Sequence, residues 1–278
     1  MKNKYPIYVI SKGRWKSPLT CRALDEMSID YKLIIEPDEF ENYSKAVNSD
    51  RIIVAPENFS KQGNGSIPVR NFVWEYSIQN NDKRHWILDD NIEQFNRMNN
   101  NLQHKCVSAS IFRAAEDFVD RYSNVAIAGF EYDFFLKSRV KWNPFRLNTR
   151  IYSCSLIRND LKQRWRGKYN EDTDLSIRVL KDGWCTILFL AFIQQKKQTM
   201  TTDGGNSDIY KETNERREFA ESLRNQHPDI VKVTRKFGRW HHHVNYRVFK
   251  KNKLKRIKSF NPEQLKRVDN YGMELISK

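Results

Sequence analysis

The fold of this chain is decided by W-E-Y-S-I-Q-N-N-D-K-R-H-W-I-L-D-D-N, residues 74–91. A helix-like run leads into a short apolar strand at residues 85–88, which delivers Asp89 and Asp90 to its carboxyl end. Two carboxylates at the end of an apolar strand are costly unless a cation lies beside them. A divalent metal ion that carries a diphosphate is the obvious candidate, because hard cations bind carboxylate and phosphate oxygens. The alternative is a solvated turn in which Asp89, Asp90 and Asn91 cap a following helix.

Short apolar runs alternate with helical patterns on both sides of this stretch. We expect strands at residues 6–11, 31–36, 51–55, 85–88, 125–128, 150–156 and 185–190. We expect helices at residues 18–27, 69–80, 110–122, 172–182 and 209–225. This alternation predicts an α/β fold with a mostly parallel sheet. We place one folded domain at residues 1–245 and a basic extension at residues 246–278.

Polar clusters follow the first, second and fourth expected strands, at the strand ends where open α/β sheets bind ligands. The first cluster offers a glycine for close approach of a donor and two cations for its phosphates, and consists of Ser11, Lys12, Gly13 and Arg14. Glu36, after the second strand, could accept a hydrogen bond from a ribose hydroxyl or lie in an exposed loop. The sequence has neither a G-x-G-x-x-G motif nor a P-loop, so it supports neither Rossmann-type NAD binding nor P-loop chemistry.

Three acidic residues open the helix expected at residues 172–182. They occur in N-E-D-T-D, residues 170–174, where carboxylates complement the positive end of the helix dipole. A carboxylate there could also take the proton of an acceptor hydroxyl. We assign that catalytic role to Asp172, with Glu171 and Asp174 as supporting groups.

Three consecutive histidines occur in the segment G-R-W-H-H-H. In an extended strand, His241 and His243 face one way and His242 the other, so the three do not easily bind one ion. One of them could complete a metal site or contact a diphosphate, and the alternative is a basic surface strand. Gly204 and Gly205 could form a backbone amide cradle for an anion or an ordinary loop.

The net charge of +15 is concentrated in two basic blocks. Residues 231–278 contain 14 Lys and Arg against 3 Asp and Glu, and residues 137–168 contain 10 against 1. Such blocks on an otherwise acidic body predict a polyanionic partner. In the second block, cations alternate with rings that could stack on bases, and we assign DNA binding to Lys141, Trp142, Arg146, Arg150, Trp165 and Arg166. Alternatively, the basic blocks make the protein surface soluble, and the tail binds an acidic membrane surface.

Size and cysteine usage limit the remaining classes of protein. A chain of 278 residues with 13% aromatic residues can bury a full core and is not a disordered protein. The cysteines, none of them in a C-x-x-C pair, are Cys21, Cys106, Cys154 and Cys185. We therefore expect buried thiols rather than a zinc knuckle, no membrane span, no export signal and a location in the reducing cytoplasm.

Several motifs follow one another along the chain: R-N-F-V-W-E-Y-S-I, K-R-H-W-I-L-D-D-N-I, Y-N-E-D-T-D-L-S-I-R-V-L, G-G-N and G-R-W-H-H-H-V-N-Y. In this order they resemble the TET-associated glycosyltransferases, phage enzymes with a nucleotide-diphospho-sugar transferase (GT-A) fold. The resemblance covers roughly residues 5–249. It implies a Rossmann-like mixed sheet with flanking helices and transfer of a sugar from a nucleotide-sugar to a hydroxymethylated pyrimidine in DNA, in the host cytoplasm during infection.

The resemblance also implies roles for the site residues. Asp89 and Asp90 would bind the donor and a Mn²⁺ or Mg²⁺ ion, Asp172 would be the base, and His241 or His242 would assist the diphosphate. The candidate metal ligands are Asp89, Asp90, Asn91 and His242. The motif is Asp-Asp-Asn where the family pattern is Asp-x-Asp, which leaves open which side chain contacts the metal.

The expected reaction transfers the sugar of a UDP-sugar to the hydroxyl of 5-hydroxymethylcytosine in double-stranded DNA and releases UDP. Arabinose and glucose are both open as the sugar, as are retention and inversion. A base taken from a duplex would be flipped out, with Trp142 and Trp165 as candidates to stack on it. The rivals are a glycosyltransferase of the same fold that acts on a polysaccharide or protein, and a DNA-binding module whose transferase site is dead.

Overall fold

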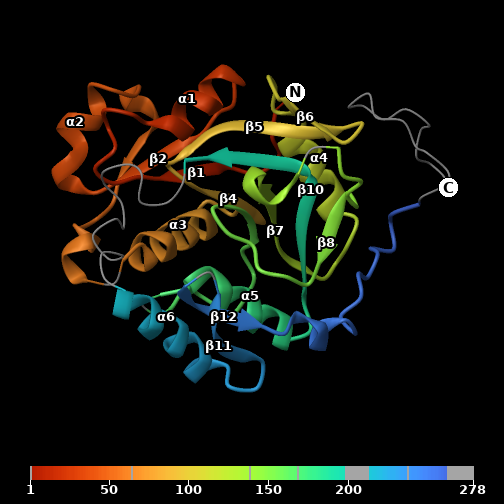
Figure 1. Cartoon of the computed structure of the whole chain (residues 1–278). Helices are drawn as coiled ribbons and strands as arrows, with labels where there is room; N and C mark the ends of the chain where they lie inside the picture. The colour runs from red at the N-terminus through yellow and green to blue at the C-terminus, as the bar shows by residue number, and fades with distance from the viewer. Residues whose placement is uncertain are drawn as a thin grey trace.

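A large mixed β-sheet forms the centre of the protein (Figure 1). The computed structural model describes residues 2–63, 65–137, 139–167, 169–197, 213–236 and 238–261. Within this part of the chain the sheet has ten strands: β1 (Ile7–Ile10), β2 (Lys32–Ile35), β3 (Ile52–Val54), β4 (Arg84–Asp89), β5 (Ile92–Asn99), β6 (Leu102–Lys105), β7 (Val125–Tyr132), β8 (Phe145–Leu147), β9 (Cys154–Arg158) and β10 (Cys185–Lys196). Their order is β3-β2-β1-β4-β9-β7-β10-β5-β6, and β8 pairs with β10.

The direction of the strands brings several strand ends to one edge of the sheet. Strands β3, β2, β1 and β4 pair in parallel, and β7 pairs in parallel with β10. Strand β9 lies between β4 and β7 and is antiparallel to both. Strands β1, β2, β4, β7 and β10 therefore run the same way, and their carboxyl ends line one edge, which we call the site edge.

The prediction of a mixed α/β sheet with flanking helices is confirmed, but the expectation of mostly parallel order holds only for β1 to β4 and for the pair β7 and β10. Strands β5, β6, β8 and β9 pair antiparallel with their neighbours. The β5–β6 hairpin turns at Asn100 and Asn101, whose φ angles are +49° and +59°. Two successive residues with positive φ form the tight turn that suits an antiparallel hairpin, and asparagine tolerates this conformation.

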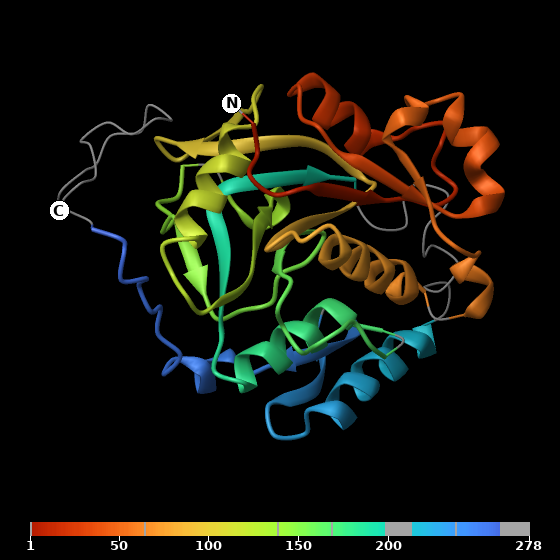
Figure 2. The ribbon, with the colours of Figure 1, turned by 180° about the vertical axis from the view of Figure 1, so that it is seen from behind.

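Helices cover both faces of the sheet (Figure 2). They are α1 (Leu19–Glu26), α2 (Phe40–Ser44), α3 (Ile67–Gln79), α4 (Ser110–Val119), α5 (Glu171–Lys181) and α6 (Thr213–Gln226). On one face, α1 and α4 pack against the sheet around Trp86, whose ring lies 5.0 Å from that of Phe112. On the other face, α3 and α5 pack around Ile87 through Trp74 and Leu175. Each large apolar side chain buried in this way contributes roughly 1.5–3 kcal/mol.

A third layer packs on the outer side of α5. It consists of α6 and a two-stranded sheet of β11 (Val231–Lys236) and β12 (Arg239–Val244). Leu223 and Ile230 join Ile177 of α5 in one buried cluster. This layer carries the histidine segment, which is the strand-like segment that the sequence predicted.

The first part of the predicted basic extension is fastened to the domain. Asn252 donates to the carbonyls of Leu180 and Trp184 at 2.8 Å, and Asn148 donates to the carbonyls of Phe249 and Asn252 at 2.9 Å. These contacts attach residues 246–261 to the end of α5 and to the sheet, while residues 262–278 lie outside the described part of the chain.

The four cysteines are free and buried, as the sequence predicted. Burial raises the pKa of the Cys21 thiol to about 12 and that of the Cys106 thiol to about 11, so neither is a reactive thiolate near neutral pH. Among the described helices, none has the length and apolar character to cross a bilayer.

Candidate active site

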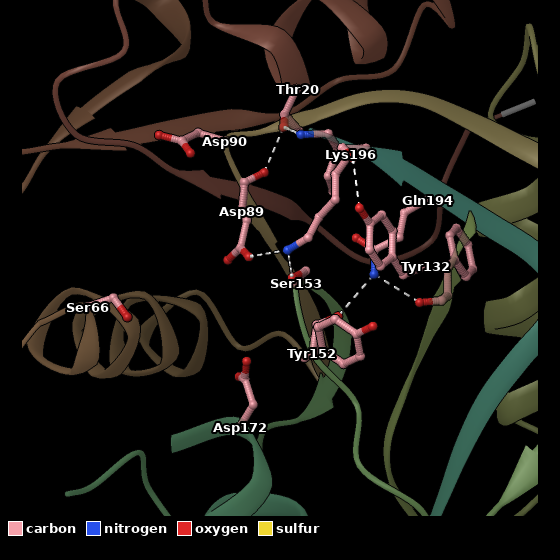
Figure 3. Close-up of polar contacts among 12 residues, drawn as sticks. Thr20, Ser66, Asp89, Asp90, Tyr132, Tyr152, Ser153, Asp172, Gln194 and Lys196 are labelled. Carbon is pink, nitrogen blue, oxygen red and sulfur yellow. Dashed lines mark hydrogen bonds and ion pairs between the residues drawn. The ribbon is translucent and has the colours of Figure 1, made fainter. Parts of the chain in front are cut away.

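Three of the residues predicted to carry the chemistry, Asp89, Asp90 and Asp172, lie at the site edge, where β1, β4 and β10 end (Figure 3). Asp89 ends β4 and Lys196 ends β10. Helices α3 and α5 begin beside them, with Ser66 just before the first and Asp172 in the first turn of the second. Helix N-termini carry partial positive charge, so two of them facing one point favour an anionic ligand there.

The end of β4 is fixed by hydrogen bonds on both sides. The Thr20 hydroxyl donates to the Asp89 carbonyl at 2.7 Å and accepts from the Ile92 amide at 2.9 Å. The Asp89 amide donates to the Ser153 carbonyl at 2.8 Å. Strand β5 begins at Ile92, so the alternative interpretation of Asp89-Asp90-Asn91 as a cap for a following helix is wrong.

Glycine at position 129 permits the close approach that sets this geometry. A Cβ atom on Gly129 of β7 would lie 2.3 Å from the Cys154 carbonyl oxygen and 2.4 Å from the Ile151 side chain. The segment before β9 therefore lies tightly against β7, and Ser153 is held beneath the end of β4 with a φ angle of +63°.

Asp89 lies on the side of the strand end that faces α3 and α5, and its carboxylate is shared between two cations. Its carboxylate accepts from the Arg70 guanidinium at 2.8 Å and lies 3.7 Å from the Lys196 ammonium, which also donates to the Ser153 hydroxyl at 2.7 Å. Burial acts to raise the pKa of Asp89, but Arg70 and Lys196 outweigh it, so the pKa lies below its usual range. Asp89 is therefore ionised, and its side chain keeps 25% of its surface exposed.

Asp90 faces the opposite way, toward β1. Its carboxylate accepts from the Ser11 hydroxyl at 2.6 Å and the Lys12 amide at 3.4 Å, and pairs with Arg14. The side chain is only 8% exposed, and burial raises its pKa despite Arg14 and Ser11. Successive residues of a strand point to opposite sides, which separates Asp89 from Asp90. Asp90 thus ties the predicted donor loop at residues 11–14 to the strand end.

Arg70 is the centre of an acidic cluster on the Asp89 side. Besides Asp89, its guanidinium lies 4.0 Å from a Glu171 oxygen and 3.9 Å from an Asp172 oxygen. The cation stacks over the Trp165 ring at 4.9 Å and is 5% exposed. Three carboxylates share Arg70, and Lys196 adds one further positive charge, so this group of five side chains carries a formal charge of −1.

The negative charge of Asp172 is balanced less well by Arg70 and Lys196 than that of Asp89. Burial raises its pKa to about 7, Glu171 and Asp89 add to the shift, and Arg70 opposes it. Its Oδ1 atom is enclosed yet accepts no hydrogen bond from the described residues. In Figure 3 its carboxylate points toward Asp89 from the start of α5. A carboxyl group with a pKa near neutrality suits a general base.

The acidic cluster has the chemistry of a site for a hard cation. Mg²⁺ and Mn²⁺ need only one or two protein carboxylates when phosphate oxygens complete their shell. Asp89, which is ionised and keeps part of its surface exposed, supplies one such carboxylate. The predicted four-ligand set is not gathered: within the described ranges no three His, Cys, Asp or Glu side chains form a metal-binding group, and Asp90 turns away to Arg14.

Asp174 is not part of the reaction centre, and its prediction as a supporting catalytic group is wrong. Its side chain is 1% exposed and accepts from His227 at 2.8 Å, Arg178 at 2.7 Å and Arg166 at 3.1 Å. Burial opposes ionisation of Asp174, but these partners lower its pKa to about 2. The carboxylate therefore joins α5 to the end of α6 and has no surface to offer a substrate.

Two further predicted donor residues are engaged by the protein itself. Glu36, at the end of β2, accepts from the Ser60 amide at 2.7 Å and from the Ser60 hydroxyl. The Gly13 amide donates to Glu39 at 2.6 Å, and Gly13 has the positive φ of +68° that its loop requires. Lys12 is about half exposed, with its ammonium 3.9 Å from Glu36.

The predicted DNA-binding residues divide into exposed and enclosed groups. Lys141 and Arg146 are exposed, and Arg146 lies 3.7 Å from Glu131. Trp142 is partly buried, and its indole donates to the Lys137 carbonyl at 3.0 Å. Trp165 is only 3% exposed beneath Arg70, so the prediction that it stacks on a flipped base is wrong.

Arg150 and Arg166 complete the predicted DNA-binding set. The side chain of Arg166 is half exposed, but its guanidinium is paired with Asp174. Arg150 stacks on Tyr152 at 5.0 Å. Neither side chain is therefore a freely extended surface cation like Lys141.

Arg150 also lines a cavity of about 250 Å³ with the histidine segment; its other lining residues are Thr234, Lys236, His241, His242 and His243. Burial lowers the pKa of His242 to about 4, and Arg150 adds to the shift, so His242 is neutral. The predicted contact of His241 with a diphosphate stays a prediction. The predicted cradle at Gly204 and Gly205 lies outside the described residues.

Two functional side chains, Arg70 and Lys196, were missed from the sequence. Lys196 ends a strand at the site edge, as Asp89 does, so the rule that ligands bind at strand ends could have identified it. It was missed because the strand was expected to stop at Leu190, before F-I-Q-Q-K. Arg70 is the one cation in helix α3, and no local pattern in the sequence distinguishes it from a surface arginine.

Comparison with known proteins confirms the expected family. A family model described as TET-Associated Glycosyltransferase matches residues 5–205. The match covers most of the chain and includes Asp89, Asp172 and Lys196, whereas the histidine segment lies beyond its end. No curated protein matches the chain. The chain therefore belongs to the TET-associated glycosyltransferase family.

Proposed function

We propose that this glycosyltransferase moves a pentose or hexose from a UDP-sugar to the hydroxyl of 5-hydroxymethylcytosine in DNA. The observation that carries the proposal is the pairing of two unlike carboxyl groups across Arg70. Asp89 is ionised and held by cations, whereas Asp172 has a pKa of about 7 and an oxygen that accepts no hydrogen bond from the described residues. One group suits the donor diphosphate and the other suits proton transfer.

The donor diphosphate would lie at the start of α3 and α5, beside Arg70 and Lys196. The helix dipoles and these cations stabilise the negative charge that develops on the leaving diphosphate. A Mn²⁺ or Mg²⁺ ion held by Asp89 would supply Lewis-acid stabilisation of the same charge. The loop at residues 11–14, fastened by Asp90, would close the other side of the nucleotide.

Asp172 would accept the proton of the acceptor hydroxyl. As the hydroxyl oxygen bonds to the anomeric carbon, the bond from that carbon to the diphosphate oxygen breaks, and the UDP leaves with the bonding pair. A base is required only for this direct displacement, which inverts the anomeric configuration. Inversion is therefore the outcome that we propose, and the anomer of the product decides it.

DNA is proposed as the acceptor because exposed cations lie on the segment that follows β7. Lys137, Arg139, Lys141 and Arg146 are all exposed. Such cations bind the phosphate backbone without reading sequence, as a modification enzyme with many sites requires. A neutral polysaccharide acceptor would give these residues no partner of opposite charge.

The proposal is tested by mass spectrometry of nucleosides after incubation of hydroxymethylated duplex DNA with the enzyme, manganese and a panel of nucleotide-sugars. We expect one donor to add a pentose or hexose mass to 5-hydroxymethylcytosine, and unmodified cytosine DNA to gain nothing. Asp172→Asn provides the matched inactive control. DNA would be rejected as the substrate if no donor gave a sugar adduct on DNA while the enzyme released UDP in the presence of a carbohydrate acceptor.

A further inference from the structure

Two phenylalanine rings stand exposed where β7 ends at the site edge. Phe134 is 67% and Phe135 47% exposed, and both follow Tyr132 in the short helical turn Asp133–Phe135. The Tyr132 and Phe134 rings lie 6.0 Å apart and nearly parallel, and Phe135 meets both edge-on at 5.7 and 5.5 Å. We call Tyr132, Phe134 and Phe135 the aromatic platform.

The aromatic platform is joined directly to the reaction centre. The Tyr132 hydroxyl donates to the Lys196 carbonyl at 3.2 Å, and the Lys196 ammonium lies 5.8 Å from the centre of the Tyr132 ring. The same ammonium lies 3.7 Å from Asp89. Lys196 therefore lies between Tyr132 of the platform and the carboxylate assigned to the donor.

The platform is held rigidly although its rings are exposed. Leu136 closes the turn by donating its amide to the Asp133 carbonyl at 3.0 Å, and its side chain is 3% exposed. Its carbonyl accepts from the Gln103 side chain at 3.0 Å, which ties the turn to strand β6. A fixed turn that presents apolar rings to solvent loses little conformational entropy when a ligand covers the rings.

We propose that the aromatic platform binds the acceptor base, so that the 5-hydroxymethylcytosine ring stacks on Phe134 and Phe135 while its hydroxyl faces Asp172. This inference rests on the proposed function. It gives Phe134 and Phe135 the role that the sequence had assigned to tryptophans, one of which is enclosed beneath Arg70. Aromatic side chains stack on every base, so the platform contributes affinity without sequence preference.

The charges around the platform select a nucleic acid as its occupant. Lys137, Arg139 and Lys141 follow the rings directly and are exposed, and Arg146 is exposed a few residues further on. Aromatic rings flanked by cations match a base together with its own phosphates. An apolar protein partner would cover the aromatic rings but would leave these four cations without a group of opposite charge.

The test is steady-state kinetics with hydroxymethylated DNA, first for the wild type and then for the double variant Phe134→Ala/Phe135→Ala. We expect the KM for DNA to rise by roughly 5- to 150-fold, the loss that follows removal of base stacking. The affinity for UDP, measured by titration, should stay at the wild-type value because the rings face the acceptor. Phe40→Ala is the matched control, since Phe40 is 44% exposed on α2.

A second variant separates stacking from simple burial of apolar surface. Phe134→Tyr/Phe135→Tyr keeps two rings and should retain a KM for DNA within about threefold of the wild type. A wild-type KM in the alanine variant, or equal losses in the alanine, tyrosine and Phe40→Ala variants, would overturn the platform while leaving the proposed function intact. A wild type that transfers no sugar to any hydroxymethylated DNA would overturn the proposed function itself, and the platform with it.

Discussion

The end of β4 separates two regions that contain similar charged groups in different balance. On the β1 side, Asp90 is enclosed and matched by Arg14 and Ser11. On the α5 side, Asp89 shares its cations with Glu171 and Asp172, and the acidic groups remain in excess. The β1 side is thus a completed structural connection, whereas the α5 side has capacity for a ligand. Adjacent aspartates in one motif therefore have different roles, which substitutions at each can separate.

The largest expected effect is on the α5 side, at Asp89. Asp89→Asn keeps the shape of the side chain but removes the charge that balances Arg70 and Lys196 and would hold the diphosphate or its metal. We expect kcat to fall by about 10³-fold, since such electrostatic stabilisation contributes several kcal/mol. Steady-state UDP release measures the loss, and retained DNA binding in a gel shift shows that the fold persists. A variant with more than a tenth of wild-type turnover would remove Asp89 from the mechanism.

The second effect is the pH dependence that Asp172 imposes. Because burial raises its pKa to about 7, the base form is lost as the pH falls, so kcat/KM should rise up to about pH 7 and level off above it. Asp172→Asn should lose roughly 10²–10³-fold and flatten this profile. Glu171→Gln removes a neighbouring negative charge and should move the midpoint to lower pH. A midpoint that does not move, or moves upward, would assign the titration to another group.

The third effect is on stability, and it is expected on the β1 side. Asp90→Ala removes the acceptor of Ser11 and the carboxylate that faces Arg14 in a largely enclosed pair. We expect the free energy of unfolding to fall by about 3 kcal/mol. Denaturant titration measures this loss. Asp89→Ala is the control and should destabilise less, because Arg70 still has Glu171 and Asp172 as acidic partners. If Asp89→Ala is the more destabilising of the two, the two sides have been assigned the wrong way round.

The smallest effect is also on the α5 side, where the ionised carboxylate of buried Asp172 lowers the free energy of unfolding. The raised pKa of Asp172 means that between about pH 4 and 7 the folded protein holds a proton that the unfolded chain releases. The stability from that proton is present below pH 4 and is lost as the pH rises through about 7. Asp172→Asn has no such proton to lose, so its stability relative to the wild type should rise by roughly 2–3 kcal/mol between pH 5 and pH 8. Thermal unfolding at pH 5 and pH 8 checks whether its advantage grows with pH.

The parts of the fold that the sequence predicted are those with a strong local signal. The apolar runs of β1, β2 and β4 and the helices α3 and α5 lie within a few residues of their expected bounds. Strands β5 and β6 were missed because their pairing depends on a hairpin with polar side chains. The carboxyl-end rule placed Asp89, Asp90 and Ser11 at the site edge correctly.

The parts that the sequence could not predict depend on orientation in three dimensions. Asp89 and Asp90 are indistinguishable as letters, and only the strand geometry shows which one meets Arg70. Asp172 and Asp174 belong to the same acidic run, yet Asp174 contacts His227 whereas Asp172 faces Arg70 at the site edge. The exposed rings of Phe134 and Phe135 could be recognised only once the core had been filled by other aromatic residues.

The most direct test of the central claim, that the α5 side of β4 is the reaction centre, is a crystal structure with UDP and Mn²⁺. Anomalous scattering locates the manganese ion independently of any activity. We predict an ion about 2.0–2.2 Å from an Asp89 oxygen and from diphosphate oxygens, with Asp172 on the same side and Asp90 still paired with Arg14. An ion bound by Asp90 instead, or a diphosphate remote from Arg70 and Lys196, would contradict the account.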